Sequence, residues 1–131
     1  MYKDIIESNM TNEEKFYKIA ELIHKKDDQA LSEEEKLIIF VDIYLNEVNN
    51  GGFEQYFLNT EGEFADNTVK FLKKINGQNF SALLKGAIEI YTNEKDDDVR
   101  FDKLNELDND FYELNAIDYD NLYKICVENL K

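Results

Sequence analysis

The fold is decided by residues 32–52, which read SEEEKLIIFVDIYLNEVNNGG. Ser32 followed by Glu35 is a capping-box pattern, in which each side chain binds the backbone amide of the other residue and so starts a helix. Apolar residues over 37–48 cover almost every side of that helix, so we expect it to lie at the centre of the protein. The Asn-Asn-Gly-Gly sequence at 49–52 predicts its end, because glycine adopts the left-handed conformation that closes a helix.

Helical periodicity continues on both sides of this segment, and the chain contains no proline to interrupt it. Thr11 and Glu14 form a second capping-box pattern ahead of an apolar stripe. The spacing of apolar residues predicts further helices at about residues 12–26, 53–58, 63–75, 80–91, 101–114 and 122–130. We therefore predict an all-α fold, a single compact multi-helix domain of about six to eight helices that spans residues 1–131.

The charge of the chain limits its partners. Among 131 residues, 29 are acidic and 15 are basic, which gives a net charge of −14 and a pI near 4.4. Such a charge repels phosphate backbones and anionic lipids, so we expect no direct binding to nucleic acid or to membranes. One cysteine, no secretory signal pattern and no apolar run of membrane length together predict a cytoplasmic protein.

Few residues are suited to catalysis or to binding a cofactor. His24 is the only histidine, and we expect it at a helix C-terminus on the surface. Cys126 lies on the apolar stripe of the last predicted helix, where a cysteine acts as a small hydrophobic residue. Gly51-Gly52 is not followed by the lysine of a phosphate-binding loop. The sequence predicts no catalytic residues, no metal site and no cofactor, and hence a non-enzymatic protein.

Acidic residues concentrate between positions 94 and 120, where eleven acids face three basic residues. A calcium loop beginning at Asp96 fails, because Phe101 stands where glycine is required. A helix over 101–115 is about 22 Å long and carries a carboxylate every ~4 to 5 Å, close to the ~3.4 Å charge spacing of one DNA strand. These acids are the predicted partner-binding residues: Glu94, Asp96, Asp97, Asp98, Asp102, Glu106, Asp108, Asp110, Glu113, Asp118 and Asp120.

A short motif around the double glycine resembles the signature of a bacterial family of small acidic helical domains. Its residues are Asn50, Gly51, Gly52, Phe53, Gln55, Tyr56, Asn59 and Gly62. The resemblance extends over about residues 32–130, and the family takes its name from a DNA-mimic protein. It implies a DNA-mimic role without catalysis, in which an acidic surface occupies the DNA-binding face of a helix-turn-helix regulator.

The motif itself has a structural interpretation, a sharp turn between helices. In this turn Phe53 and Tyr56 pack into the core, and the side chains of Asn50 and Gln55 bind free backbone groups. Our leading hypothesis is therefore a binding protein whose acidic face competes with DNA for a basic transcription regulator. An immunity protein that neutralises a toxin and a small-molecule-binding domain are the alternatives, and a homodimer remains open. We also expect charge reversal of Asp108, Asp110 and Glu113 to leave folding nearly unchanged.

Overall fold

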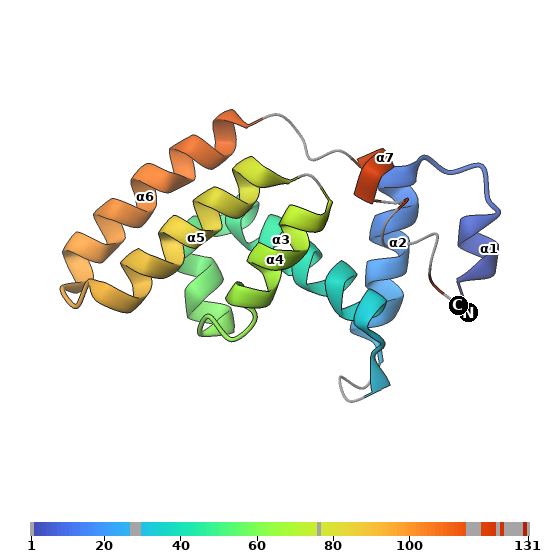
Figure 1. Cartoon of the computed structure of the whole chain (residues 1–131), viewed down its shortest axis with the longest axis horizontal. Helices are drawn as coiled ribbons and strands as arrows, with labels where there is room; N and C mark the ends of the chain where they lie inside the picture. Colours follow the sequence, from blue (N-terminus) through green and yellow to red (C-terminus); the bar gives the residue numbers. More distant parts are fainter. Residues whose placement is uncertain are drawn as a thin grey trace.

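The computed structural model describes residues 2–26, 30–75, 77–114, 119–122, 124 and 130. Over these residues the chain is helical and contains no strand, which confirms the all-α prediction. The helices follow one another as shown in Figure 1: α1 (Lys3–Ile6), α2 (Asn12–His24), α3 (Glu33–Thr60), α4 (Ala65–Lys74), α5 (Gln78–Asn93), α6 (Asp97–Glu113) and α7 (Tyr119–Leu122).

The predicted N-cap residues Thr11 and Ser32 start α2 and α3, but only the capping box of Ser32 and Glu35 is complete, because the Glu14 side chain accepts the Thr11 hydroxyl instead of its amide. The Thr11 hydroxyl accepts the Glu14 amide at 3.1 Å, and the Ser32 hydroxyl accepts the Glu35 amide at the same distance. Glu35 completes its box by accepting the Ser32 amide at 2.9 Å. Local sequence therefore sets where both helices begin.

The central helix does not end at the double glycine. α3 continues from Glu33 to Thr60, with one residue, Gly52, outside helical geometry at φ 80° and ψ −177°. We predicted that the helix ends at 49–52 and that a separate short helix follows at 53–58. The separation is wrong, because the chain kinks at Gly52 and resumes the helix at once. α3 ends beyond this point, where Glu61 takes the left-handed conformation.

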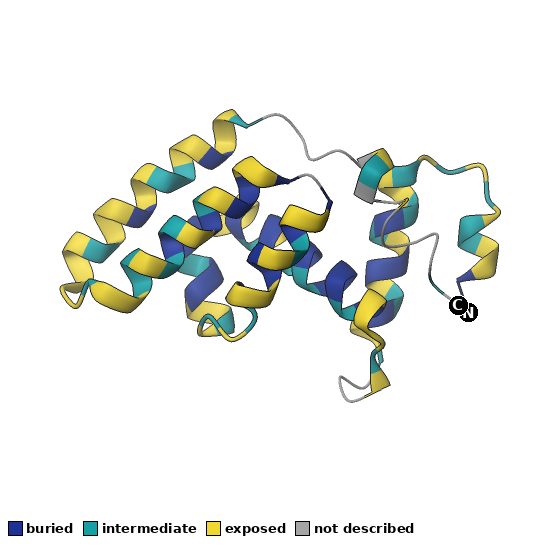
Figure 2. Ribbon diagram, viewed as in Figure 1, coloured by how far each residue is buried: buried dark blue, intermediate teal, exposed yellow. Residues whose placement is uncertain are grey.

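α3 lies at the centre of the molecule, as its apolar sequence predicts. α2, α4 and α6 each pack against it, and α5 packs on both α4 and α6 (Figure 1). Ile38, Val41, Tyr44 and Val48 of α3 are buried. Figure 2 shows the buried residues in dark blue on the ribbon. Burial at about 25 cal/mol per Å² of apolar area makes this core the main source of stability.

The remaining differences lie near the ends of the chain. α1 is a single turn that apolar periodicity did not reveal. α6 begins at Asp97, four residues ahead of the predicted start, because Asp96 caps it. The predicted helix at 122–130 and the core position of Cys126 lie outside the described residues, apart from a few positions. Within the described part of the chain, no helix is long and apolar enough to cross a membrane.

Candidate partner-binding surface

α6 starts with an aspartate cap. The Asp96 side chain accepts the backbone amides of Asp98 at 3.0 Å and Val99 at 3.1 Å. Asp97 and Asp98 lie in the first turn, where negative charge interacts favourably with the helix dipole. Leu104 and Phe111 turn towards the core, which leaves the opposite side of α6 open to solvent (Figure 2).

The predicted partner-binding acids do not form one uniform surface. Glu94 is half-buried, and its 2.9 Å ion pair with Lys103, together with a hydrogen bond from the Asp96 amide, lowers its pKa. Asp120 lies on α7 and accepts a 2.7 Å hydrogen bond from Asn12 of α2. Asp118 is outside the described residues. The exposed acids on or capping α6 are Asp96, Asp97, Asp98, Asp102, Glu106, Asp110 and Glu113.

Five of these acids form a line along the outer side of α6. They follow each other at intervals of four, four, four and three residues, and such intervals place side chains on one face of a helix. We call them the acidic stripe: Asp98, Asp102, Glu106, Asp110 and Glu113. The stripe is about 22 Å long with one charge per ~5 to 6 Å, compared with ~3.4 Å along one DNA strand. The sequence reveals this stripe when the positions of the acids around the helix are considered. A count of the acids alone does not reveal it.

Asp108 lies between α6 and the kink of α3. Its Oδ1 accepts the Phe53 amide at 2.7 Å, and a Cβ on Gly52 would collide with its Oδ2. Burial raises the pKa of this carboxyl, the Phe53 amide lowers it, and the charge of Glu54 raises it further. The carboxylate therefore caps the second half of α3. We expected charge reversal of Asp108 to leave folding nearly unchanged, and that expectation did not include this capping role. Asp108 is half-buried and does not belong to the exposed surface.

Tyr112 fastens the same two helices one turn further along α6. Its hydroxyl donates to the carbonyl oxygen of Val48 at 2.9 Å, just before the kink. Burial raises the pKa of Tyr112, and the nearby charge of Asp108 adds to the effect. Asp108 and Tyr112 thus hold α6, and with it the acidic stripe, against the kinked centre of α3.

The other motif residues also organise the kink. Gln55 and Asn59 both donate to Glu47 Oε2, at 2.9 and 2.8 Å, and so connect the helix before the kink with the helix after it. Gly51 has no Cβ, which leaves room for the Gln55 side chain. We expected Gln55 to bind free backbone groups, but it binds a side chain instead.

Phe53 and Tyr56 pack in the core as predicted, and both contact the Tyr44 ring. Burial raises the pKa of Tyr56 to about 12. Gly62 takes a positive φ of 74° just after α3 ends, while Asn50 is exposed. Most of the motif therefore builds the scaffold.

His24 ends α2, as predicted, and its Nε2 lies 2.9 Å from the buried carboxylate of Asp42. Asn46 donates to the other oxygen of Asp42 at 2.9 Å. A groove of about 600 Å³ lies beside His24, with Phe40 and Phe64 stacked in its wall. No group of three potential metal ligands occurs within the described residues.

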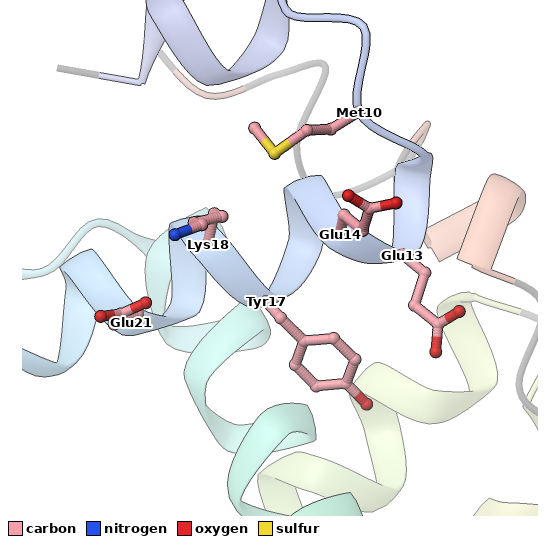
Figure 3. A pocket seen from close by; sticks show the side chains of 6 residues that line it. All are labelled: Met10, Glu13, Glu14, Tyr17, Lys18 and Glu21. Carbon is pink, nitrogen blue, oxygen red and sulfur yellow. The ribbon is translucent and has the colours of Figure 1, made fainter.

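A second hollow lies over α2 and is lined by Met10, Glu13, Glu14, Tyr17, Lys18 and Glu21. Figure 3 shows that these side chains point in different directions rather than towards one point. A ligand site usually has polar groups that converge on the bound molecule. The polar side chains around this hollow do not converge in that way.

Comparison with known proteins identifies one family. The model of the family described as DMP19-like protein matches residues 29–129, which include α3, the kink and α6. No curated protein and no solved structure matches the chain.

Proposed function

Because the chain belongs to the DMP19-like family of DNA-mimic type, we propose that it is a non-enzymatic acidic binding protein whose α6 surface occupies the DNA-binding face of a basic protein. A helix-turn-helix transcription regulator is the proposed class of partner. The chain would then act by competing with DNA, and it would need neither a cofactor nor a metal.

The acidic stripe is the observation that carries this proposal. Four successive pairs of like charges lie along one face of α6, from Asp98 to Glu113. Each such pair destabilises a helix by about 0.2 to 0.5 kcal/mol, so the four cost roughly 1 to 2 kcal/mol. The two cations of α6 do not relieve this repulsion, because Arg100 pairs with Asp97 and Lys103 with Glu94. A stripe that lowers stability is readily explained by a cationic partner that neutralises it.

The scaffold also suits this role. Hydrogen bonds from Phe53 to Asp108 and from Tyr112 to Val48 fix α6 on α3 at two places. A prearranged charged surface loses little conformational freedom on binding. The net charge of −14 would attract a basic partner over a Debye length of about 10 Å at 0.1 M salt.

The proposal is tested by capture and competition. Immobilised protein is incubated with an extract of its own cells beside a stripe-neutral variant, Asp102→Asn/Glu106→Gln/Asp110→Asn. A DNA-binding protein that the wild type retains, that the variant loses and that duplex DNA displaces is the expected result. Equal retention by both proteins, or retention that duplex DNA does not affect, contradicts DNA mimicry. Recovery of an inhibited toxin would instead favour an immunity protein.

A further inference from the structure

Two large side chains on α6 are exposed although they are aromatic. Phe101 has 52% of its surface exposed and Tyr112 has 53%. They are eleven residues apart, which at about 100° and 1.5 Å per residue places them on the same flank of the helix, ~16 Å apart. Val99 is also exposed, with 40% of its surface accessible. It lies two residues before Phe101 and therefore on nearly the opposite side of the helix.

The flank that carries Phe101 and Tyr112 adjoins α3 on both sides of the kink at Gly52. The Tyr112 hydroxyl reaches Val48, while Asp108, on a neighbouring turn of the same flank, reaches Phe53. Later residues of α3 thus face earlier residues of α6, so the two helices run antiparallel at this seam. Phe101 lies further back along α6 and therefore corresponds to a later part of α3.

Leu58 adds a third exposed apolar side chain on that later part of α3, with 76% of its surface exposed. It lines a hollow together with Arg100, the residue before Phe101, and with the carboxylate residues Glu54 and Glu61. The hollow has a volume of about 480 Å³. Apolar side chains thus lie along the α3–α6 seam among acidic ones.

We propose that Phe101, Tyr112 and Leu58 form an apolar anchor that binds an amphipathic basic helix of a partner protein. This inference rests on the proposed function and specifies the partner's chemistry. A DNA backbone presents phosphates and no aromatic ring, so the anchor has no counterpart in DNA. It instead contacts apolar side chains of the partner, which lie beside the cations that bind phosphate. Phe and Tyr are enriched in the centres of protein interfaces, where they supply large contact areas.

Charge complementarity selects this occupant. The anchor is bordered by Glu54 and Glu61, which line the hollow beside Leu58, and by Asp98 and Asp102, which lie near Phe101 along α6. The cation in the hollow, Arg100, is paired with Asp97, so a helix with cations beside its apolar face fits this site. A second copy of this chain would bring like charge to the same place. The hydrogen bond to Val48 holds Tyr112 in position, which reduces the entropy lost when a partner binds.

The test uses two dye-labelled synthetic helices of about 18 residues with equal numbers of lysines. One helix carries leucine on its uncharged face and the other carries glutamine. Fluorescence anisotropy measures the Kd of each helix for the full chain at low and high salt. We expect the leucine helix to bind wild-type protein at least tenfold more tightly. The double variant Phe101→Ala/Leu58→Ala should lose most of this preference, because it lacks two anchor side chains.

Val99→Ala is the matched control, because it removes an exposed apolar side chain from another side of the same helix. It should retain the tenfold preference. Circular dichroism and the Tm verify that each variant is folded. Equal binding of both helices to wild-type protein, or a preference that survives the double variant, overturns the anchor while leaving the charged stripe intact. Failure of both helices to bind, or binding that salt does not weaken, contradicts the proposed function as well.

Discussion

Replacing Asp108 with alanine should destabilise the fold, although this residue looks like one more surface acid in the sequence. The change removes the acceptor of the Phe53 amide, 2.7 Å away at the start of the second half of α3. Loss of a cap costs about 1 to 2 kcal/mol, which for 131 residues corresponds to a Tm lower by about 4 to 8 °C. Asp110→Ala is the control, since it removes an exposed carboxylate that caps no helix and relieves two like-charge pairs, so it should not lower stability.

A double-mutant cycle with Gly52 tests the geometry of the kink. Gly52→Ala alone should cost more than about 1 kcal/mol, because residue 52 has φ 80° and its Cβ would collide with Asp108. In the Asp108→Ala background the collision disappears, so the same substitution should cost less. Urea unfolding followed by circular dichroism supplies the free energies. Additive effects, or equal stability of Asp108→Ala and Asp110→Ala, would refute the role assigned to this carboxylate.

Three further predictions concern pH and helix contacts. Asp108→Asn keeps an oxygen acceptor but removes the ionisable group. Because the folded pKa of Asp108 is raised, wild-type protein should lose stability relative to this variant as the pH rises above about 4. Unfolding at several pH values measures this difference in stability, and a difference that does not change with pH contradicts the raised pKa. Burial raises the pKa of Glu35, but the Lys26 ammonium, the Ser32 amide and the Tyr2 hydroxyl outweigh it and lower the pKa to about 2. Glu35→Gln should therefore lower stability by about 1 to 2 kcal/mol at pH 7, and this difference should vanish as the pH falls from about 4 towards 2. Tyr112→Phe removes the donor to Val48 and should cost about 0.5 to 1.5 kcal/mol in urea unfolding, whereas unchanged stability would show that this hydrogen bond does not hold α6 on α3.

The helical fold was predictable because its signals are local. The N-cap at Thr11, the capping box at Ser32 and the apolar surface of α3 are all determined by residues within a few turns of one another. The kink could be predicted from the sequence only in part. Two glycines indicate that the helix is disturbed, but its continuation depends on Asp108, which lies 55 residues after Phe53 in the sequence. Sequence spacing alone does not reveal that contact.

The candidate surface was predictable as a region but not residue by residue. The excess of acid between 94 and 120 identified α6, while burial separated the stripe from Asp108 and ion pairing separated it from Glu94. Asp96 is a helix cap as well as an acid, and this explains the early start of α6. The exposure of Phe101 could not be inferred, because an aromatic residue in a helical pattern usually belongs to the core.

The central claim is that the acidic stripe of α6 is the functional surface. Its most direct test compares wild-type protein, the stripe-neutral variant and a control with equal charge loss on other helices, Glu21→Gln/Asp66→Asn/Glu89→Gln. The affinity of each for the captured DNA-binding protein is measured as a function of salt, and the free energy of unfolding is measured in parallel. We predict that the stripe-neutral variant binds at least tenfold more weakly, with a shallower salt dependence, while its stability rises by about 1 kcal/mol as repulsion is relieved. Equal affinities of the stripe-neutral and control variants would contradict the claim.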